Sequence, residues 1–296
     1  MSRVSHPRIV TLLAITSVLA VARASEAQAD LAGKWSATLQ EDYEHRIPGP
    51  ELGDYTGIAV NEAARVKAQT WDASILSQPE QQARPHPAQY SMRGPANLRI
   101  EEIVDPGTYR VLAYKITGLF GNADRTIWMD GRPHPSARAL HTWNGFSTGE
   151  WMGQTLKVTT THMKAAFIQR NGVPASVQSR MTEYFVRHGD RLLNMSIVED
   201  PVYLEEPFVR TTTFAANPER VIAPPSVMEI VDEIAAPRAG YVPHFPRDTR
   251  HGEFSERFGL PYEATQGGRD TLYPEYVQTL QQMMRGTAAG SSGDPR

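Results

Sequence analysis

The sequence contains no cysteine and no apolar run long enough to cross a bilayer as a helix. The first absence excludes disulfides, lipid attachment through cysteine, thiolate catalysis and cysteine-ligated metal sites. The longest apolar stretch, residues 9–21, falls short of the roughly 20 residues that a membrane-spanning helix needs. Lys and Arg are scattered without a basic stripe, so we expect neither nucleic acid nor an anionic membrane as a partner.

Motifs for common cofactors are also missing. The chain has no glycine-rich phosphate-binding loop and no helical histidine pair, so we expect no nucleotide cofactor and no motif-based metal site. Residues 145–149 do spell Gly-x-Ser-x-Gly, with Ser147 at the centre. That motif requires a strand-to-helix turn, whereas this stretch has the pattern of a strand within a β meander, so we do not assign Ser147 as a nucleophile.

The first 29 residues have the three parts of a secretory signal. Arg3 and Arg8 form a basic start, residues 9–21 are apolar, and residues 27–29 form a small-x-small cleavage site. The sequence therefore predicts a periplasmic or secreted protein that begins at Asp30 and has no stable membrane insertion after cleavage. The leader holds three arginines and one glutamate, so the mature chain keeps 27 basic and 32 acidic residues, a net charge of −5.

Segments of strand character dominate the chain up to Pro218. Short turns join them, and no alternation of strands with helices occurs, which predicts an all-β fold built as an antiparallel meander barrel. Asn61 is expected to cap a short N-terminal helix over residues 62–71. The predicted strands are residues 31–39, 98–104, 108–117, 126–129, 145–151, 155–162, 180–187, 191–200 and 208–214.

The composition changes after Pro218, where prolines become frequent. We expect residues 30–218 to form the barrel domain and residues 219–285 to form a partly helical arm that packs on it. Helices are predicted at residues 228–235 and 275–285, with a disordered tail over residues 286–296.

The predicted strand at residues 145–151 suggests a container. It places Gly145, Ser147 and Gly149 on one face, which is almost without side chains and would leave room for a molecule if it faced inward. We therefore expect Gly145 and Ser147 to contact a small apolar or aromatic ligand. The aromatic residues expected to wall or plug this container are Trp35, Trp128, Trp143 and Trp151.

Two Pro-His-Pro triplets hold histidines in stiff, extended segments. They contain His86 and His134. A histidine fixed in this way can touch a ligand at the rim of a barrel, and it can equally be part of an exposed turn.

Four ionisable residues alternate with apolar residues on predicted strands, namely His162, Glu183, Glu199 and Arg210. In one interpretation they form a satisfied internal network, because an unpaired buried charge costs several kcal/mol. In the other, His162 is a general base that Glu183 orients, Arg210 stabilises an oxyanion or carboxylate, and Glu199 is a second acid. Metal binding by the same histidine and carboxylates is a minor alternative, and hydrolysis of glycosides by a carboxylate pair stays open.

Two resemblances bear on this interpretation, the first as an analogy of architecture and the second as support for an exported β-rich protein. Gly33-x-Trp35 at the head of the first strand resembles the start of lipocalins and other calycin barrels, which implies a barrel that the tryptophan plugs at one end. The motifs at residues 125–133, 142–156, 170–174, 199–201, 267–268 and 273–276 are similar to those of a large group of secreted bacterial proteins of unknown function. That second resemblance implies no particular activity.

Three functional hypotheses follow from the sequence. The first is a binding module that encloses a small apolar or aromatic molecule. The second is a cofactor-independent lyase, isomerase or dehydratase that acts on such a molecule through the four ionisable residues. The third is a structural role in the cell envelope, for which the proline-rich arm would supply the contact surface.

Overall fold

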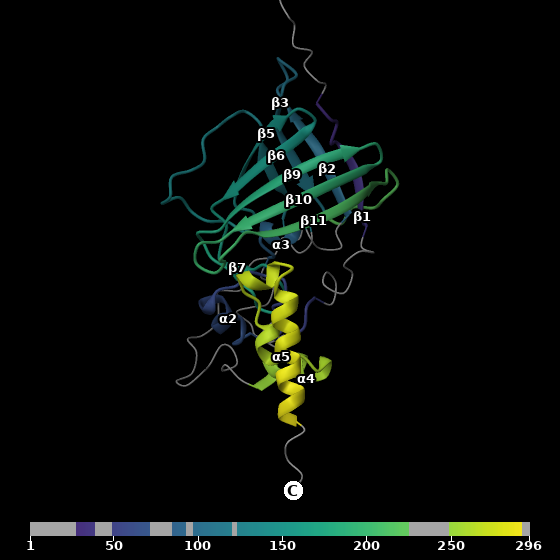
Figure 1. Cartoon of the computed structure of the whole chain (residues 1–296). Coiled ribbons are helices and arrows are strands. Elements are labelled where there is room, and N and C mark those ends of the chain that lie inside the picture. The colour runs from purple at the N-terminus through teal and green to yellow at the C-terminus, as the bar shows by residue number, and fades with distance from the viewer. Residues whose placement is uncertain are drawn as a thin grey trace, which may run out of the picture.

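The computed structural model describes residues 28–38, 49–71, 85–92, 97–119, 123–224 and 249–291. Most of the expected secretory leader, the helix predicted at residues 228–235 and the last part of the expected tail lie outside these residues. Within them, nine strands close into one barrel, which confirms the predicted β-barrel. Figure 1 shows the barrel strands above the helices. The barrel strands are β1 (Gly33–Thr38), β2 (Asn97–Val104), β3 (Val111–Thr117), β4 (Arg125–Trp128), β5 (Phe146–Met152), β6 (Thr155–Thr161), β9 (Arg180–His188), β10 (Arg191–Glu199) and β11 (Phe208–Ala216).

The barrel closes because β1 pairs on both of its edges. Trp35 lies opposite Ala216 of β11 on one side and opposite Leu98 of β2 on the other. Strand order otherwise follows the sequence, except that β6 pairs directly with β9 and the two short strands β7 (Ala166–Phe167) and β8 (Pro174–Ala175) form a separate sheet.

One strand pair corrects the predicted antiparallel meander. β4 and β5 are parallel, with Ile127 opposite Ser147, whereas every other neighbouring pair in the barrel is antiparallel. Parallel neighbours need a long crossover, and residues 129–145 supply it. The sequence predicts a loop between antiparallel strands here, and that expectation is wrong because loop length alone does not fix strand direction.

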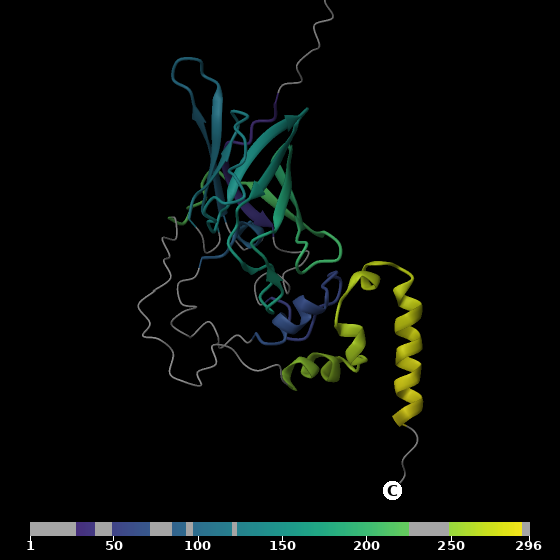
Figure 2. The same ribbon diagram turned by 90° about the vertical axis from the view of Figure 1, so that its left-hand side faces the viewer.

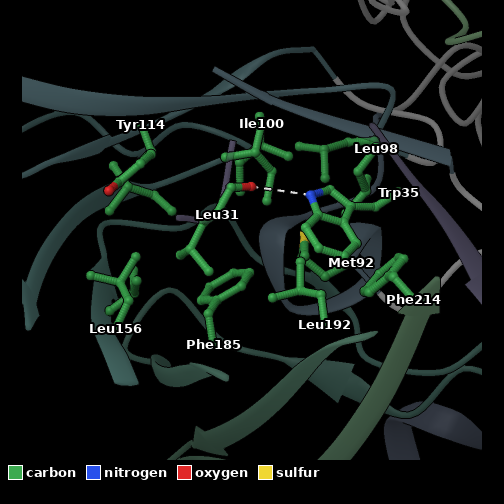
Figure 3. Packing of buried hydrophobic residues seen from close by; sticks show 14 residues of the cluster. Leu31, Trp35, Met92, Leu98, Ile100, Tyr114, Leu156, Phe185, Leu192 and Phe214 are labelled. Atoms are coloured by element: carbon green, nitrogen blue, oxygen red, sulfur yellow. Dashed lines mark hydrogen bonds between the residues drawn. The ribbon is translucent and has the colours of Figure 1, made fainter. Parts of the chain in front are cut away.

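The barrel interior holds an apolar cluster, which Figure 3 shows from close by. Trp35 is fully buried in it, and its Nε1 atom donates a hydrogen bond to the carbonyl oxygen of Leu31 at 3.1 Å. The guanidinium of Arg187 lies 5.3 Å from the centre of the Trp35 ring system. The other members are Met92, Leu98, Ile100, Tyr114, Ile116, Leu119, Ile127, Leu156, Val158, Phe185, Leu192 and Phe214.

Short helices gather at one end of the barrel, which we call the helical end (Figure 1). α2 (Glu62–Ala68) begins where Asn61 Oδ1 accepts a hydrogen bond from the backbone nitrogen of Ala64, as the sequence predicts. α3 (Ala88–Ser91) links two apolar clusters, because Ala88 belongs to a cluster under the barrel and the adjacent Met92 belongs to the interior cluster.

The C-terminal segment contacts the loop that precedes α2 through residues 265–268. Its elements are η3 (Thr249–Gly252), α4 (Glu253–Phe258), η4 (Tyr262–Thr265), η5 (Arg269–Leu272) and α5 (Tyr276–Ser291). The backbone nitrogen of Tyr55 bonds to the carbonyl oxygen of Thr265 at 2.9 Å, and that of Gly268 bonds to the carbonyl oxygen of Ile58 at 2.8 Å. Gly267 must be glycine there, since a Cβ atom would lie 2.3 Å from the carbonyl oxygen of Tyr55.

Helix α5 stands away from the barrel, as Figure 2 shows. It continues past the predicted end at residue 285 to Ser291, so the start of the expected disordered tail is helical. None of the helices in the described part of the chain has both the length and the apolar character that crossing a bilayer requires.

Candidate functional site

A belt of buried polar side chains crosses five neighbouring strands inside the barrel. Arg125 of β4 donates from Nη1 to Glu183 Oε1 at 3.1 Å and forms a second, short contact with Glu183 Oε2 from Nη2. Its Nη2 atom also donates to Thr160 at 2.8 Å and its Nε atom to Ser147 at 3.2 Å. Asn194 of β10 donates to Glu183 Oε1 at 3.2 Å. We call these five residues the interior polar belt.

The interior polar belt is sealed from solvent. Arg125 and Glu183 are 1% and 0% exposed, and the other members are equally buried. A buried ion pair is tolerated only when its remaining donors and acceptors are hydrogen-bonded, which the two hydroxyls and the amide achieve here. The arrangement fits the internal network that the sequence analysis proposed for Glu183.

Arg125, the partner of Glu183, was not among the residues expected at a site. The predicted strand starts at Thr126, whereas β4 starts one residue earlier, and Arg125 and Ile127 share its buried face. The two-residue period of a strand therefore contained the signal, and an error of one residue at the strand start concealed it.

The four ionisable residues predicted to cluster are not brought together. Glu183 is inside the barrel, as expected, but Glu199 is exposed at the end of β10. The inward residues of β10 are Leu192, Asn194 and Val198, one position out of phase with the predicted face. Apolar residues occupy both faces of this strand, so periodicity could not choose between them.

His162 lies just after β6 and takes part in a chain of hydrogen bonds on the outer barrel surface. Its Nδ1 atom is 2.7 Å from Thr161 Oγ1, and its Nε2 atom is 2.9 Å from the carbonyl oxygen of Ser136. The same Thr161 hydroxyl is 2.7 Å from His134 Nδ1, and His134 Nε2 is 2.8 Å from Thr148 Oγ1. We call these residues the outer histidine chain.

When both histidines are neutral, the carbonyl oxygen at one end sets the direction of the hydrogen bonds in the outer histidine chain. Because a carbonyl only accepts, neutral His162 carries its proton on Nε2 and accepts at Nδ1 from Thr161. The Thr161 oxygen then accepts from His134 Nδ1, and His134 Nε2 accepts from Thr148. Burial, with Arg180 and His162 as further causes, lowers the pKa of His134, so the neutral form that this pattern requires is favoured.

The backbone at His162 explains why its side chain leaves the predicted face. Its φ angle is +59°, a left-handed conformation that few residues other than glycine adopt. The alternation of β6 stops at Thr161, so the imidazole turns to the crossover loop on the outside instead of following Leu156 and Val158 inward. A backbone of this kind is not visible in the sequence.

The aromatic residues expected to line a container fall into two groups. Trp35 is in the interior cluster, and Trp151 packs against it with its ring 6.4 Å from that of Tyr114. Trp128 and Trp143 lie elsewhere, the first under Arg132 at 3.5 Å and the second near Lys164 at 5.1 Å.

His86, from the other Pro-His-Pro triplet, contacts an aromatic ring. Its imidazole is 4.5 Å from the ring of Tyr90, and burial, with Arg170 as a second cause, lowers the pKa of His86 to about 4. His86 is therefore neutral at pH 7.

The glycine-rich face of β5 points inward, as expected, but the space beside it is occupied. A Cβ atom at Gly149 would lie 2.5 Å from Met129 Sδ and 3.1 Å from methyl groups of Ile127 and Leu156. Ser147, the polar residue of this face, belongs to the interior polar belt. The space left by the absent side chain of Gly149 is filled by the side chains of Met129, Ile127 and Leu156, so no ligand fits there.

A groove opens at the helical end of the barrel, beside the first residues of β11. Its volume is about 320 Å³, and it runs between this strand and the loop before α2. Phe208, Val209, Ile58 and Pro50 provide apolar surface. We call this feature the mouth groove.

Polar side chains also line the mouth groove. Arg210 is one of them, and its guanidinium lies 4.7 Å from the centre of the Phe208 ring. Gln169 is 3% exposed, and its Oε1 atom has no hydrogen-bond partner within the described ranges. The Asp54 carboxylate accepts two hydrogen bonds from Thr56, from the backbone nitrogen at 3.2 Å and from the hydroxyl at 2.6 Å, both at Oδ1.

The mouth groove has two features of small-molecule sites, a concave shape and a lining of both apolar and polar residues. Arg210 was a sequence candidate, whereas Gln169 and Asp54 were missed. Gln169 stands between Ile168 and an Asn-Gly turn, and nothing in that pattern distinguishes it from an exposed loop residue.

Within the described ranges, no group of three or more His, Asp or Glu side chains is arranged to hold a metal ion. Comparisons of the chain with protein-family models, with curated proteins and with solved structures give no match. The geometry of the chain itself therefore carries the functional argument, and it points to the mouth groove.

Proposed function

We propose that this protein binds a small molecule in the mouth groove. The observation that carries the proposal is the groove itself, in which the apolar residues Phe208 and Ile58 line the same concave surface as the polar residues Arg210 and Asp54. A concave surface with both kinds of side chain can hold and orient a small molecule.

The volume of the groove restricts the ligand. Binding sites for small molecules range from about 300 to 1,000 Å³, and the mouth groove lies near the lower limit. The ligand is therefore small, and Phe208, Val209, Ile58 and Pro50 can contact the apolar part of the molecule expected from the sequence. Its proposed place is at the end of the barrel rather than deep inside, where the space beside Gly149 is filled.

Export is part of the proposal and rests on the leader sequence alone. The basic start, the short apolar run and the Ala-Gln-Ala site before Asp30 favour a periplasmic or secreted location. N-terminal sequencing of protein from its native host tests this, and a chain that still begins at Met1 contradicts it.

Mass spectrometry of compounds that co-purify with the protein tests the binding proposal. Val209→Trp places an indole in the groove from a position that is 53% exposed, so the barrel should still fold. Val104→Trp is the matched control, because Val104 is also exposed on a strand and does not line the groove. We expect a small molecule with the wild type and the control but not with Val209→Trp. Equal recovery from all three proteins, or none from the wild type, contradicts the proposal.

A further inference from the structure

We infer that helix α5 is a dimerisation surface, on which α5 of a second copy of this chain packs in the antiparallel direction. Three features support dimerisation, and none of them involves the mouth groove. They are an apolar stripe along α5, an acidic groove beside that stripe, and the positions of the two charged residues of this segment.

Apolar side chains form a stripe along α5. Tyr276, Leu280 and Met283 follow one another at intervals of four and three residues, the spacing found at the seam between two packed helices. Val277 and Met284 widen the stripe and are 54% and 46% exposed. A helix of 16 residues is marginally stable in water by itself, and α5 stands away from the barrel (Figure 2). Burial of the stripe against another helix therefore stabilises α5.

A groove runs along one side of the stripe, between α5 and η5. Its volume is about 570 Å³, and Tyr276, Thr279 and Met283 form its wall on α5. We call it the α5 groove. Side chains of an adjacent helix can enter such a groove, as in ridges-into-grooves packing.

The lining of the α5 groove has an excess of negative charge. Among the described residues, Arg269 is the only basic side chain in the lining, and it already forms an ion pair with Glu206 at 2.8 Å. An occupant with a basic or neutral surface complements this lining. α5 itself meets that condition, because Arg285 is the only charged residue from position 276 to position 291. The acidic lining residues are Glu205, Glu263, Asp270 and Glu275.

The two charges of this segment favour the antiparallel direction. Glu275 and Arg285 are both exposed, and each lies five residues from Leu280. When the two copies of Leu280 face each other in an antiparallel pair, the partner's Arg285 lies at the level of Glu275, and twofold symmetry repeats this match at the other end. Parallel helices would instead place like charges at the same level, which is repulsive.

Sedimentation equilibrium of the full chain tests dimerisation. We expect a dimer at concentrations up to about 200 µM, because an interface made of one helix from each copy is small and therefore weak. Leu280→Glu places two carboxylates against each other at the centre of the pair, so the Kd for dimerisation should rise at least about tenfold. Gln278→Glu is the matched control, because it adds the same charge to the opposite face of the same helix and should leave the Kd unchanged.

Single cysteines test the direction of the helices, because the chain has no cysteine of its own. Under mild oxidation, Leu280→Cys should form a disulfide-linked dimer, whereas Gln278→Cys should not. A mixture of Tyr276→Cys and Met284→Cys should link one variant to the other, and neither should link to itself. These variants keep the test valid if Leu280→Glu unfolds α5.

The possible outcomes are distinct. A monomer at every concentration overturns the inference and leaves the binding proposal for the mouth groove unaffected. A dimer that survives Leu280→Glu and does not cross-link through Leu280→Cys contradicts it as well, since the contact then lies elsewhere. Self-linking of Tyr276→Cys would mean that the helices are parallel, which contradicts the antiparallel pair.

Discussion

At the scale of single residues, the interior polar belt determines how the barrel tolerates charge. Glu183→Gln removes the negative charge and leaves Arg125 buried with an uncompensated positive charge, because both side chains are at most 1% exposed. We expect a loss of about 3 to 5 kcal/mol in the free energy of unfolding. Denaturant unfolding measures this, and the double variant Arg125→Met with Glu183→Gln should recover part of the loss.

An exposed ion pair provides the control for this substitution. Lys157 and Glu150 are 2.7 Å apart on β6 and β5, and Glu150 is 66% exposed. Glu150→Gln should cost less than about 1 kcal/mol. A cost for Glu183→Gln that is as small would show that the polar belt is not buried as described.

The buried histidine at position 86 makes stability depend on pH. Its pKa is lowered to about 4 in the folded protein, against about 6.5 in the unfolded chain. Between these values the unfolded state binds the proton and the folded state does not, so stability is complete above pH 6.5 and falls as the pH drops towards 4. The loss from this group amounts to about 3 kcal/mol at most.

Thermal unfolding of the wild type and of His86→Gln at several pH values isolates the contribution of His86. The difference between the two proteins should change between pH 7 and pH 4 and should be constant above pH 7. A pH-independent difference would mean that His86 ionises equally in both states. The lowered pKa of His134 acts in the same direction and is common to both proteins.

At the scale of elements, the crossover loop of residues 129–145 is held to the β5 and β6 surface by the outer histidine chain. Thr161→Val removes the hydroxyl that bridges His134 and His162, and both Nδ1 atoms lose their partner. We expect a loss of about 1 to 3 kcal/mol, with faster hydrogen exchange at amides of this loop. Thr159→Val, on the same strand and face, is the matched control. Equal exchange in both variants would contradict the role of the chain.

At the scale of the whole molecule, the barrel and the C-terminal elements make separable contributions. A chain that ends at Pro218 keeps every barrel strand but loses Thr265 and Gly268, which bond to the loop before α2. We expect the far-ultraviolet circular dichroism of strands to persist, while binding of a co-purified molecule in the mouth groove is lost because Ile58 and Asp54 of that loop line the groove. Loss of the strand signal would show that the barrel depends on these elements.

A chain that ends at Pro274 is the control for this truncation. It removes only α5, which packs against η5 and otherwise stands apart from the body (Figure 2). Binding in the mouth groove should then be unchanged.

The sequence by itself determined the local elements. Alternation of apolar and polar residues located every barrel strand to within a few residues, and Asn61 marked the start of α2, because strand period and helix capping are properties of neighbouring residues. It also placed Glu183 on an inward face, since Met181 and Phe185 leave no other phase for β9.

Only the tertiary structure decided what those elements bring together. The pairing of Glu183 with Arg125 spans 58 residues of sequence and depends on which strands become neighbours. The parallel direction of β4 and β5 follows from the path of the crossover loop. The mouth groove joins Asp54, Gln169 and Arg210 from three distant segments. No pattern of neighbouring residues predicts that these residues lie close together, because closure of the barrel brings them together.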